Sequence, residues 1–339
     1  MKKLIGYQKG VNLGGWLSQG SKEQNHLDTF IVEADIKRIK DIGCDHLRLP
    51  VDYENIEDEF GNIKQSGFNY IEKCILWCKK YNLNLVLDLH KTPGYVFDDI
   101  KNSKGFFDNE KLKERFLIIW DRLSSRFCKY SDMIMFEMLN EITDYSYRDS
   151  WNELALRCIK VIRNNAPNVK ILYGGVDYSA VSSVKYLLPP VDENIVYNVH
   201  CYEPFVFTHQ GAYWVDKMPR DFRINYPFDY NKYLEISNKV PACVSSILND
   251  NTRLDTDFFI NLFKESVEYA EKYNISLYCG EYGVIDLAEV NSTLRWFKDI
   301  NYALSYYGIG RAVWSYKEMD FGIIGEHYEP IFDELIKYL

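Results

Sequence analysis

Eight short apolar runs, each followed by a longer segment with helical spacing, constrain the fold of this chain more than any other feature. The runs are apolar at both alternating positions, which is typical of strands that are buried on both faces of a parallel sheet. They occupy residues 10–13, 45–49, 85–89, 133–139, 170–173, 195–199, 276–279 and 311–314.

The segments between the runs place apolar residues three and four positions apart, as an amphipathic helix does. The first begins with Asp28, a good N-cap, and ends before Gly43, where a helix stop is expected. Eight strand–helix pairs in 339 residues predict an α/β fold, namely a closed (β/α)8 TIM barrel. No GxGxxG or GxxxxGKS motif follows the first run, which argues against a nucleotide-binding doubly wound sheet. The expected helices cover residues 29–42, 67–81, 109–129, 148–165, 179–188, 257–274, 289–307 and 330–338.

One long interval interrupts this alternation. Residues 203–253 separate the sixth run from its helix and are rich in Tyr, Phe, Trp, Pro and Asn. A structureless loop of this length is rare in a compact domain, and loops that follow barrel strands emerge at the carboxyl-end face. The sequence therefore predicts a single catalytic domain over residues 1–339, with a small helical insertion subdomain over residues 203–253 at the active-site rim.

The distribution of charged and apolar residues argues against two classes of partner. The net charge is −9 and the basic residues are dispersed, whereas a nucleic-acid groove needs a basic face. No apolar run approaches the length of a membrane span, and the stretch after Lys2 and Lys3 is too short for a signal peptide. We expect a monomeric cytoplasmic protein without nucleic-acid or membrane partners; an extracellular location stays open if the sequence has been trimmed.

The eight cysteines are scattered and lack the CxxC spacing of zinc sites. Cys74 and Cys78 lie four residues apart on an expected helix, but no histidine or carboxylate follows at ligand spacing. We therefore expect reduced, mostly buried thiols, with no metal and no cofactor.

Polar and aromatic side chains mark the ends of six of the runs. In a barrel these ends converge on the carboxyl-end face, where active sites are built. Each residue alone has an ordinary explanation, because a carboxylate at a strand end is commonly solvated and a lone histidine is commonly structural. The complete set predicts a functional site. Its members are Arg48, His90, Asn140, Glu141, His200, Tyr202, Glu281 and Trp314.

In its order along the chain this set resembles glycoside hydrolase family 5, the large cellulase family of retaining barrel enzymes. All eight residues of the family's pattern are present, and the match spans residues 10–316. Residues 10–16 (GVNLGGW), 77–83 (WCKKYNL) and 207–210 (FTHQ) resemble the clostridial endoglucanase C type within it. The resemblance implies an endo-acting enzyme whose partner is a β-glucan, either an oligosaccharide or a polysaccharide with β-1,4 or mixed β-1,3-1,4 linkages.

The resemblance also implies a role for each residue. Glu281 is the expected nucleophile and Glu141 the expected acid/base of a double displacement through a covalent glycosyl-enzyme intermediate. We expect the charge of Glu281 to raise the pKa of Glu141. For the other six residues, the resemblance implies supporting roles. Hydrogen bonds to Glu281 are expected from Arg48 and Tyr202, and His200 is expected near Glu141. Sugar hydroxyls are expected to bond Asn140 and His90, and the floor of the cleavage subsite is expected to be Trp314, with a cis bond to Ser315.

Three alternatives stay open. An exo-acting β-glucosidase or β-1,3-glucanase shares the Gly14-Gly15-Trp16 motif, and a mannanase or xylanase uses the same barrel. A non-catalytic glycan-binding barrel is the alternative outside the enzymes, and the replacement of either glutamate would have favoured it. Many relatives carry a second histidine where this chain has Lys91, and we expect this charged amine to alter sugar binding on the non-reducing side.

The remaining candidates each have two interpretations. The insertion aromatics either line further subsites or form a core of their own, and Trp16 either touches substrate or plugs the barrel mouth. Glu137 and Asp88 lie on the expected inward face and are partners of Arg48 or only its neighbours. Glu318 and Asp320 are expected on the rim. The insertion residues in question are Phe205, Phe207, His209 and Trp214.

Overall fold

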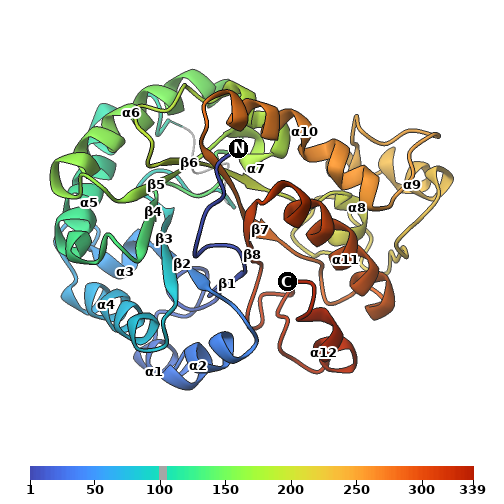
Figure 1. Ribbon diagram of the computed structural model, residues 1–339, viewed down its shortest axis with the longest axis horizontal. Coiled ribbons are helices and arrows are strands. Elements are labelled where there is room, and N and C mark those ends of the chain that lie inside the picture. The colour runs from blue at the N-terminus through green and yellow to red at the C-terminus, as the bar shows by residue number, and fades with distance from the viewer. Residues whose placement is uncertain (99–104) are drawn as a thin grey trace.

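The computed structural model describes residues 1–98 and 105–339, and its centre is a closed barrel of parallel strands in the order β1 to β8 (Figure 1). This confirms the predicted (β/α)8 barrel. The strands are β1 (Gly10–Asn12), β2 (His46–Asp52), β3 (Asn84–Lys91), β4 (Ile134–Glu137), β5 (Lys170–Gly174), β6 (Ile195–His200), β7 (Ser276–Tyr282) and β8 (Gly310–Val313).

Helices surround the barrel on its outside (Figure 1). The side chains of Asn109 and Glu289 cap the first turns of α5 and α11, and Gly308 ends α11 in the left-handed conformation that glycine adopts without strain. The α-helices are α1 (Gln24–Thr29), α2 (Glu33–Asp41), α3 (Tyr53–Ile56), α4 (Gln65–Lys80), α5 (Glu110–Phe127), α6 (Arg148–Asn165), α7 (Val176–Ser179), α8 (Phe205–Thr208), α9 (Tyr230–Ser237), α10 (Thr256–Lys272), α11 (Val290–Tyr307) and α12 (Phe332–Leu335). The 3-10 turns are η1 (Cys128–Tyr130), η2 (Tyr145–Tyr147), η3 (Val181–Tyr186), η4 (Pro241–Cys243) and η5 (Glu329–Ile331).

Three predicted elements differ from the structure. The helix expected over residues 29–42 begins later, as α2, where the side chain of Asp35 accepts from the Val32 N–H. Asp28 does not cap this helix, because it lies within α1, which ends at Thr29. The helix expected over 179–188 is wrong: α7 contains left-handed residues and η3 follows it. The helix expected over 330–338 shortens to η5 and α12.

The barrel interior is mainly apolar at its amino end, where His46 is also buried, and polar toward its carboxyl end. Leu4 and Tyr7 precede β1 and pack against the inward residues of the strands, which closes the amino end. Higher in the barrel, the inward positions are Asn12, Arg48, Asp88, Glu137 and Asn198, all at most 1% exposed. The fold therefore places a buried polar layer directly beneath the carboxyl-end face.

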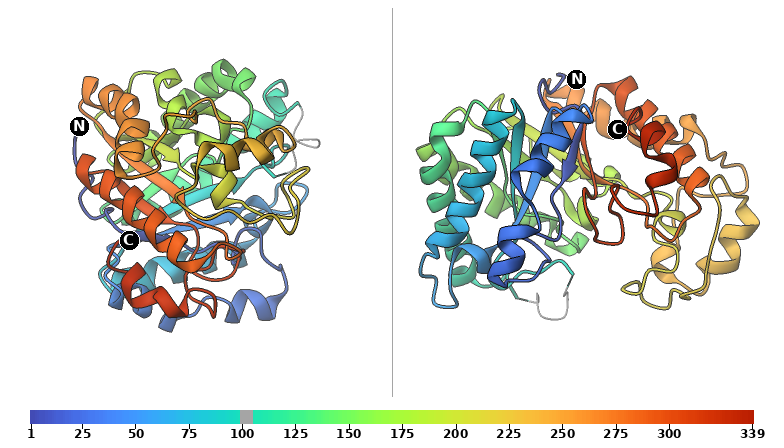
Figure 2. Two further views of the ribbon diagram at one scale, coloured as in Figure 1. Left: turned by 90° about the vertical axis from the view of Figure 1, so that its right-hand side faces the viewer. Right: turned by 90° about the horizontal axis from the view of Figure 1, so that it is seen from below.

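Residues 203–253 contain α8, α9 and η4 and lie beside α10 and α11 on one side of the barrel (Figures 1 and 2). Hydrogen bonds of 2.9 Å from Arg295 to the Tyr226 carbonyl and from Trp296 to the Glu203 carbonyl attach this segment to α11. All eight cysteines are free and seven are buried, as expected. Within the described residues, no helix has the length and apolar character needed to cross a membrane.

Candidate active site

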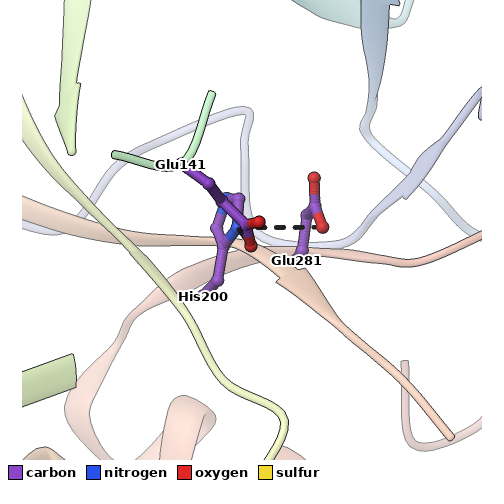
Figure 3. A group of neighbouring side chains, drawn as sticks. All are labelled: Glu141, His200 and Glu281. Atoms are coloured by element: carbon purple, nitrogen blue, oxygen red, sulfur yellow. Dashed lines mark hydrogen bonds and ion pairs between the residues drawn. The ribbon is translucent and has the colours of Figure 1, made fainter. Parts of the chain in front are cut away.

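The two glutamates predicted as a catalytic pair face each other at the carboxyl-end face (Figure 3). Glu281 belongs to β7, whereas Glu141 lies four residues beyond the end of β4. One carboxylate oxygen of each and a ring nitrogen of His200 lie within 4.8 Å of one another. Both glutamates are buried, at 7% and 5% exposure, so the pair is largely shielded from water.

Arg48 lies beneath this pair and is completely buried. Its guanidinium bonds both oxygens of Glu137 at 2.6 and 2.9 Å, and it also contacts Asp88 at 3.0 Å and Glu281 at 2.6 Å. Burial by itself would lower the pKa of Arg48, but the three carboxylates outweigh this effect and hold it well above its usual value. Of the two interpretations left open for Glu137 and Asp88, the structure supports the same one for both: each is a buried partner of Arg48.

Glu281 is fixed by hydrogen bonds to both of its oxygens. Arg48 Nη1 donates to Oε1 at 2.6 Å, and the Tyr202 hydroxyl donates to Oε2 at 3.0 Å. Both contacts were predicted from the sequence. Together these two hydrogen bonds fix the orientation of the Glu281 carboxylate.

Glu141 has a different environment. His200 Nδ1 lies 2.7 Å from its Oε1, as predicted, and the Tyr95 hydroxyl donates to its backbone carbonyl at 3.0 Å. Burial raises the pKa of Glu141 to about 8; the charge of Arg48 opposes the rise, and that of Asp88 adds to it. The largest cause is therefore burial, not the charge of Glu281 that we expected from the sequence.

Asn140, His90 and Trp314 complete the predicted set. Asn140 Oδ1 accepts from Arg48 at 2.9 Å, and the His90 ring lies parallel to Trp314 at 5.7 Å between centroids. The peptide bond from Trp314 to Ser315 is cis, as expected. Within residues 1–98 and 105–339, Asn140 Nδ2 and His90 Nε2 are buried without a hydrogen-bond partner. The structure thus brings all eight predicted residues together at the carboxyl-end face of the barrel.

The insertion aromatics divide into two groups. Phe207 is buried against Tyr226, which confirms its core interpretation. His209 instead packs edge-on against Tyr202 at 5.0 Å, and it stacks with Phe205 and contacts Trp214, which is 44% exposed. This second group extends from the catalytic pair toward solvent.

Two uncertain residues outside the insertion are now placed. Trp16 is buried against Tyr70 and Trp77 of α4, so neither interpretation made for it was correct. The Lys91 ammonium lies 3.3 Å from Asp98 and 4.0 Å from Asp52, within the polar rim of β2 and β3.

Sequence reasoning missed two asparagines that organise the site. Asn12 accepts from Arg48 at 2.9 Å and donates to the Gly280 carbonyl at 2.9 Å, while Asn198 donates to Glu137 at 2.9 Å and accepts from the Gly280 N–H. Each is a polar residue at an inward position within an apolar run. Asn198 also precedes His200 by two residues on the same strand face, which was the available signal for it. Asn12 has only glycines at that spacing, so the sequence offered no such signal there.

The cluster of Glu141, His200 and Glu281 also offers three ligand atoms at the spacing of a metal site. However, both oxygens of Glu281 already accept hydrogen bonds, and the Arg48 guanidinium beside them repels a further cation. The arrangement fits a proton-transferring carboxyl pair better than a metal centre.

An eight-stranded barrel with two facing buried carboxyl groups at its carboxyl-end face defines a class, the barrel enzymes that cleave glycosidic bonds with a carboxyl pair. Comparison with known proteins agrees with this class. Residues 7–320 match the sequence profile described as Cellulase (glycosyl hydrolase family 5). The chain therefore belongs to glycosyl hydrolase family 5.

Individual relatives extend this result. The chain is 42% identical to cellodextrinase A of Ruminococcus flavefaciens, over 92% of this chain and 86% of that protein. It is 41% identical to endoglucanase C of Acetivibrio thermocellus, over 99% of this chain and 98% of that protein. The structure of endoglucanase Cel5A from Thermotoga maritima shares the fold, with a TM-score of 0.78, 23% identity and coverage of 98% and 97%.

Replacement of Arg48 by methionine removes the cation that three buried carboxylates share. We expect Arg48→Met to lower the free energy of unfolding by about 3–5 kcal/mol at pH 8, because unpaired buried charge is costly. The deficit should shrink toward pH 5. Burial raises the pKa of Glu137 and brings that of Asp88 to about 7, so these groups accept protons as the pH falls. Urea denaturation at both pH values measures this.

The control is Arg126→Met, which breaks a partly exposed pair with Glu72 of 2.9 Å and should cost less than about 1 kcal/mol. An equal deficit for Arg48→Met at pH 5 and pH 8 would contradict the electrostatic explanation.

Proposed function

We propose that this protein is an endo-acting β-glucanase that retains anomeric configuration. The observation that carries the proposal is the approach of the Glu141 and Glu281 carboxylate oxygens to within 4.8 Å. Retaining glycosidases hold their carboxyl groups about 5–5.5 Å apart, whereas inverting enzymes need about 6.5–9.5 Å to admit a water between them.

In the first step, Glu281 attacks the anomeric carbon while Glu141 gives its proton to the departing glycosidic oxygen. The bond to the leaving sugar breaks, and an ester joins Glu281 to the remaining glycan. In the second step, Glu141 takes a proton from water, whose oxygen displaces Glu281 from the anomeric carbon. Arg48 and Tyr202 support the departing carboxylate charge, and Glu141 ends with its proton restored.

The proposed substrates are β-1,4-glucans and mixed-linkage β-1,3-1,4-glucans. The similarity to an endoglucanase over nearly the whole chain supports this choice. The equally similar cellodextrinase A favours a second candidate, an enzyme that acts on short soluble oligosaccharides. Both candidates use the same catalytic pair and differ in where along the glucan they cut.

Single alanine substitutions test the two roles on an aryl β-cellobioside with an activated leaving group. Glu281→Ala should lower turnover by roughly 10⁴-fold or more, because the attacking group is gone. Glu141→Ala should still release the aryl group, and azide should then restore turnover and yield the β-glycosyl azide. Azide reaches the covalent intermediate without needing a base.

Glu153→Ala, on the exposed face of α6, is the matched control and should retain wild-type rates. Wild-type rates in both active-site variants, or a β-azide product from Glu281→Ala, would refute the assignment.

The pH profile reports the proton on Glu141. Because burial raises the pKa of this group to about 8, the proton is present below that pH and is lost above it. We expect kcat/KM on an unactivated cello-oligosaccharide to fall as the pH rises through about 8. In Glu141→Ala, assayed on the activated aryl glycoside, this alkaline limb should be missing; its persistence would assign the limb to another group.

Product analysis separates the two candidates. An endo-acting enzyme should lower the viscosity of barley β-glucan long before small sugars accumulate, because internal cuts shorten chains quickly. Viscosity and reducing ends should be followed together in one reaction. A rise in cellobiose or glucose with little change in viscosity would instead establish the exo-acting or cellodextrin-cleaving alternative.

A further inference from the structure

Asp88 connects two functional side chains through one oxygen atom. It lies on β3 with its side chain fully buried, two residues before His90 and on the same strand face. Its Oδ2 lies 2.6 Å from Nδ1 of His90 and 3.0 Å from Nη2 of Arg48. Its Oδ1 has no partner within the described parts of the chain, so Oδ2 makes both contacts.

The identity of these partners determines where the His90 proton lies. Burial lowers the pKa of His90 to about 3, so the ring is neutral and carries a single N–H. Arg48 only donates, which makes Oδ2 of Asp88 an acceptor. Burial raises the pKa of Asp88 to about 7 against the effect of Arg48, so above pH 7 the carboxylate is ionised and accepts from both neighbours.

His90 Nε2 is buried and has no partner among residues 1–98 and 105–339. The ring lies parallel to Trp314 and meets Phe97 edge-on at 4.9 Å. The lone pair on His90 Nε2 is buried and therefore needs a hydrogen-bond donor. The neighbouring face of Trp314 suits the flat face of a sugar ring.

We propose that Asp88 is a positioning residue that holds the His90 proton on Nδ1, so that Nε2 accepts a hydrogen bond from a hydroxyl of the bound sugar. The sugar in this statement rests on the proposed function, whereas the position of the proton does not. Asn140 Nδ2 is a second buried polar atom without a partner in the described part of the chain, and it can only donate. The two side chains would therefore present opposite hydrogen-bonding polarity to the substrate.

Nitrogen NMR of the enzyme labelled with ¹⁵N-histidine tests the position of the proton directly. The His90 signals are identified by their loss in His90→Asn, and the nitrogen–proton couplings show which nitrogen carries hydrogen. At pH 8 we expect the proton on Nδ1 in the wild-type enzyme. A proton on Nε2 overturns the proposal. This readout needs neither turnover nor a folded Asp88 variant, so it remains decisive even if the enzyme does not hydrolyse β-glucan.

A double-mutant cycle tests the route by which Asp88 acts. We expect Asp88→Ala to lower kcat/KM by about 10–100-fold, the range for partners that orient metal-binding histidines. In a His90→Ala background the same change should cost less than about threefold, because the residue it positions is absent. An undiminished effect there would show that Asp88 acts through Arg48 and would overturn the proposal. Asp88→Asn keeps the acceptor oxygen and should restore most of the activity.

Discussion

The interaction on which this structure depends is the set of ion pairs that the Arg48 guanidinium makes at the centre of the barrel. The guanidinium joins β2 to carboxylates of β3, β4 and β7, and Asn12 of β1 accepts from it as well. Burial of one cation and three carboxyl groups carries a large desolvation cost, which only dense hydrogen bonding offsets. The orientation of Glu281 is therefore set from below by a side chain that needs no contact with substrate.

The same network gives the two glutamates different properties. Glu281 receives two strong donors, whereas Glu141 has His200 beside its carboxyl group and is otherwise dominated by burial. Two chemically identical side chains therefore lie in different surroundings, and burial raises the pKa of Glu141. In the mechanism we propose, the different roles of the two glutamates follow from the positions of Arg48 and Tyr202.

Much of this arrangement could be predicted because barrel geometry turns a position in the sequence into a position in space. A polar residue at the end of an apolar run must reach the carboxyl-end face, and all eight predicted residues do so.

Local patterns failed where tertiary contacts decided the conformation. Tyr178 and its neighbours in α7 adopt a left-handed conformation, and the Tyr178 N–H donates to the Ile142 carbonyl. This distant contact leaves no trace in the helical periodicity of the sequence. Trp16 was misjudged because its partner, Trp77, lies 61 residues away in the chain. The dominant effect of burial on the pKa of Glu141 depends on the complete fold.

Asn12 has a consequence for how the barrel is assembled. Its side-chain amide lies within 3.2 Å of carbonyls on both β7 and β8, at the seam where the last strands meet the first. If the seam closed two residues out of register, its apolar faces would still be buried, because side chains repeat every second residue. Such a barrel would separate Asn12 from these carbonyls and Arg48 from Glu281. Activity is thus a sensitive assay of correct ring closure, and compact but inactive molecules are the form in which errors of closure would be found.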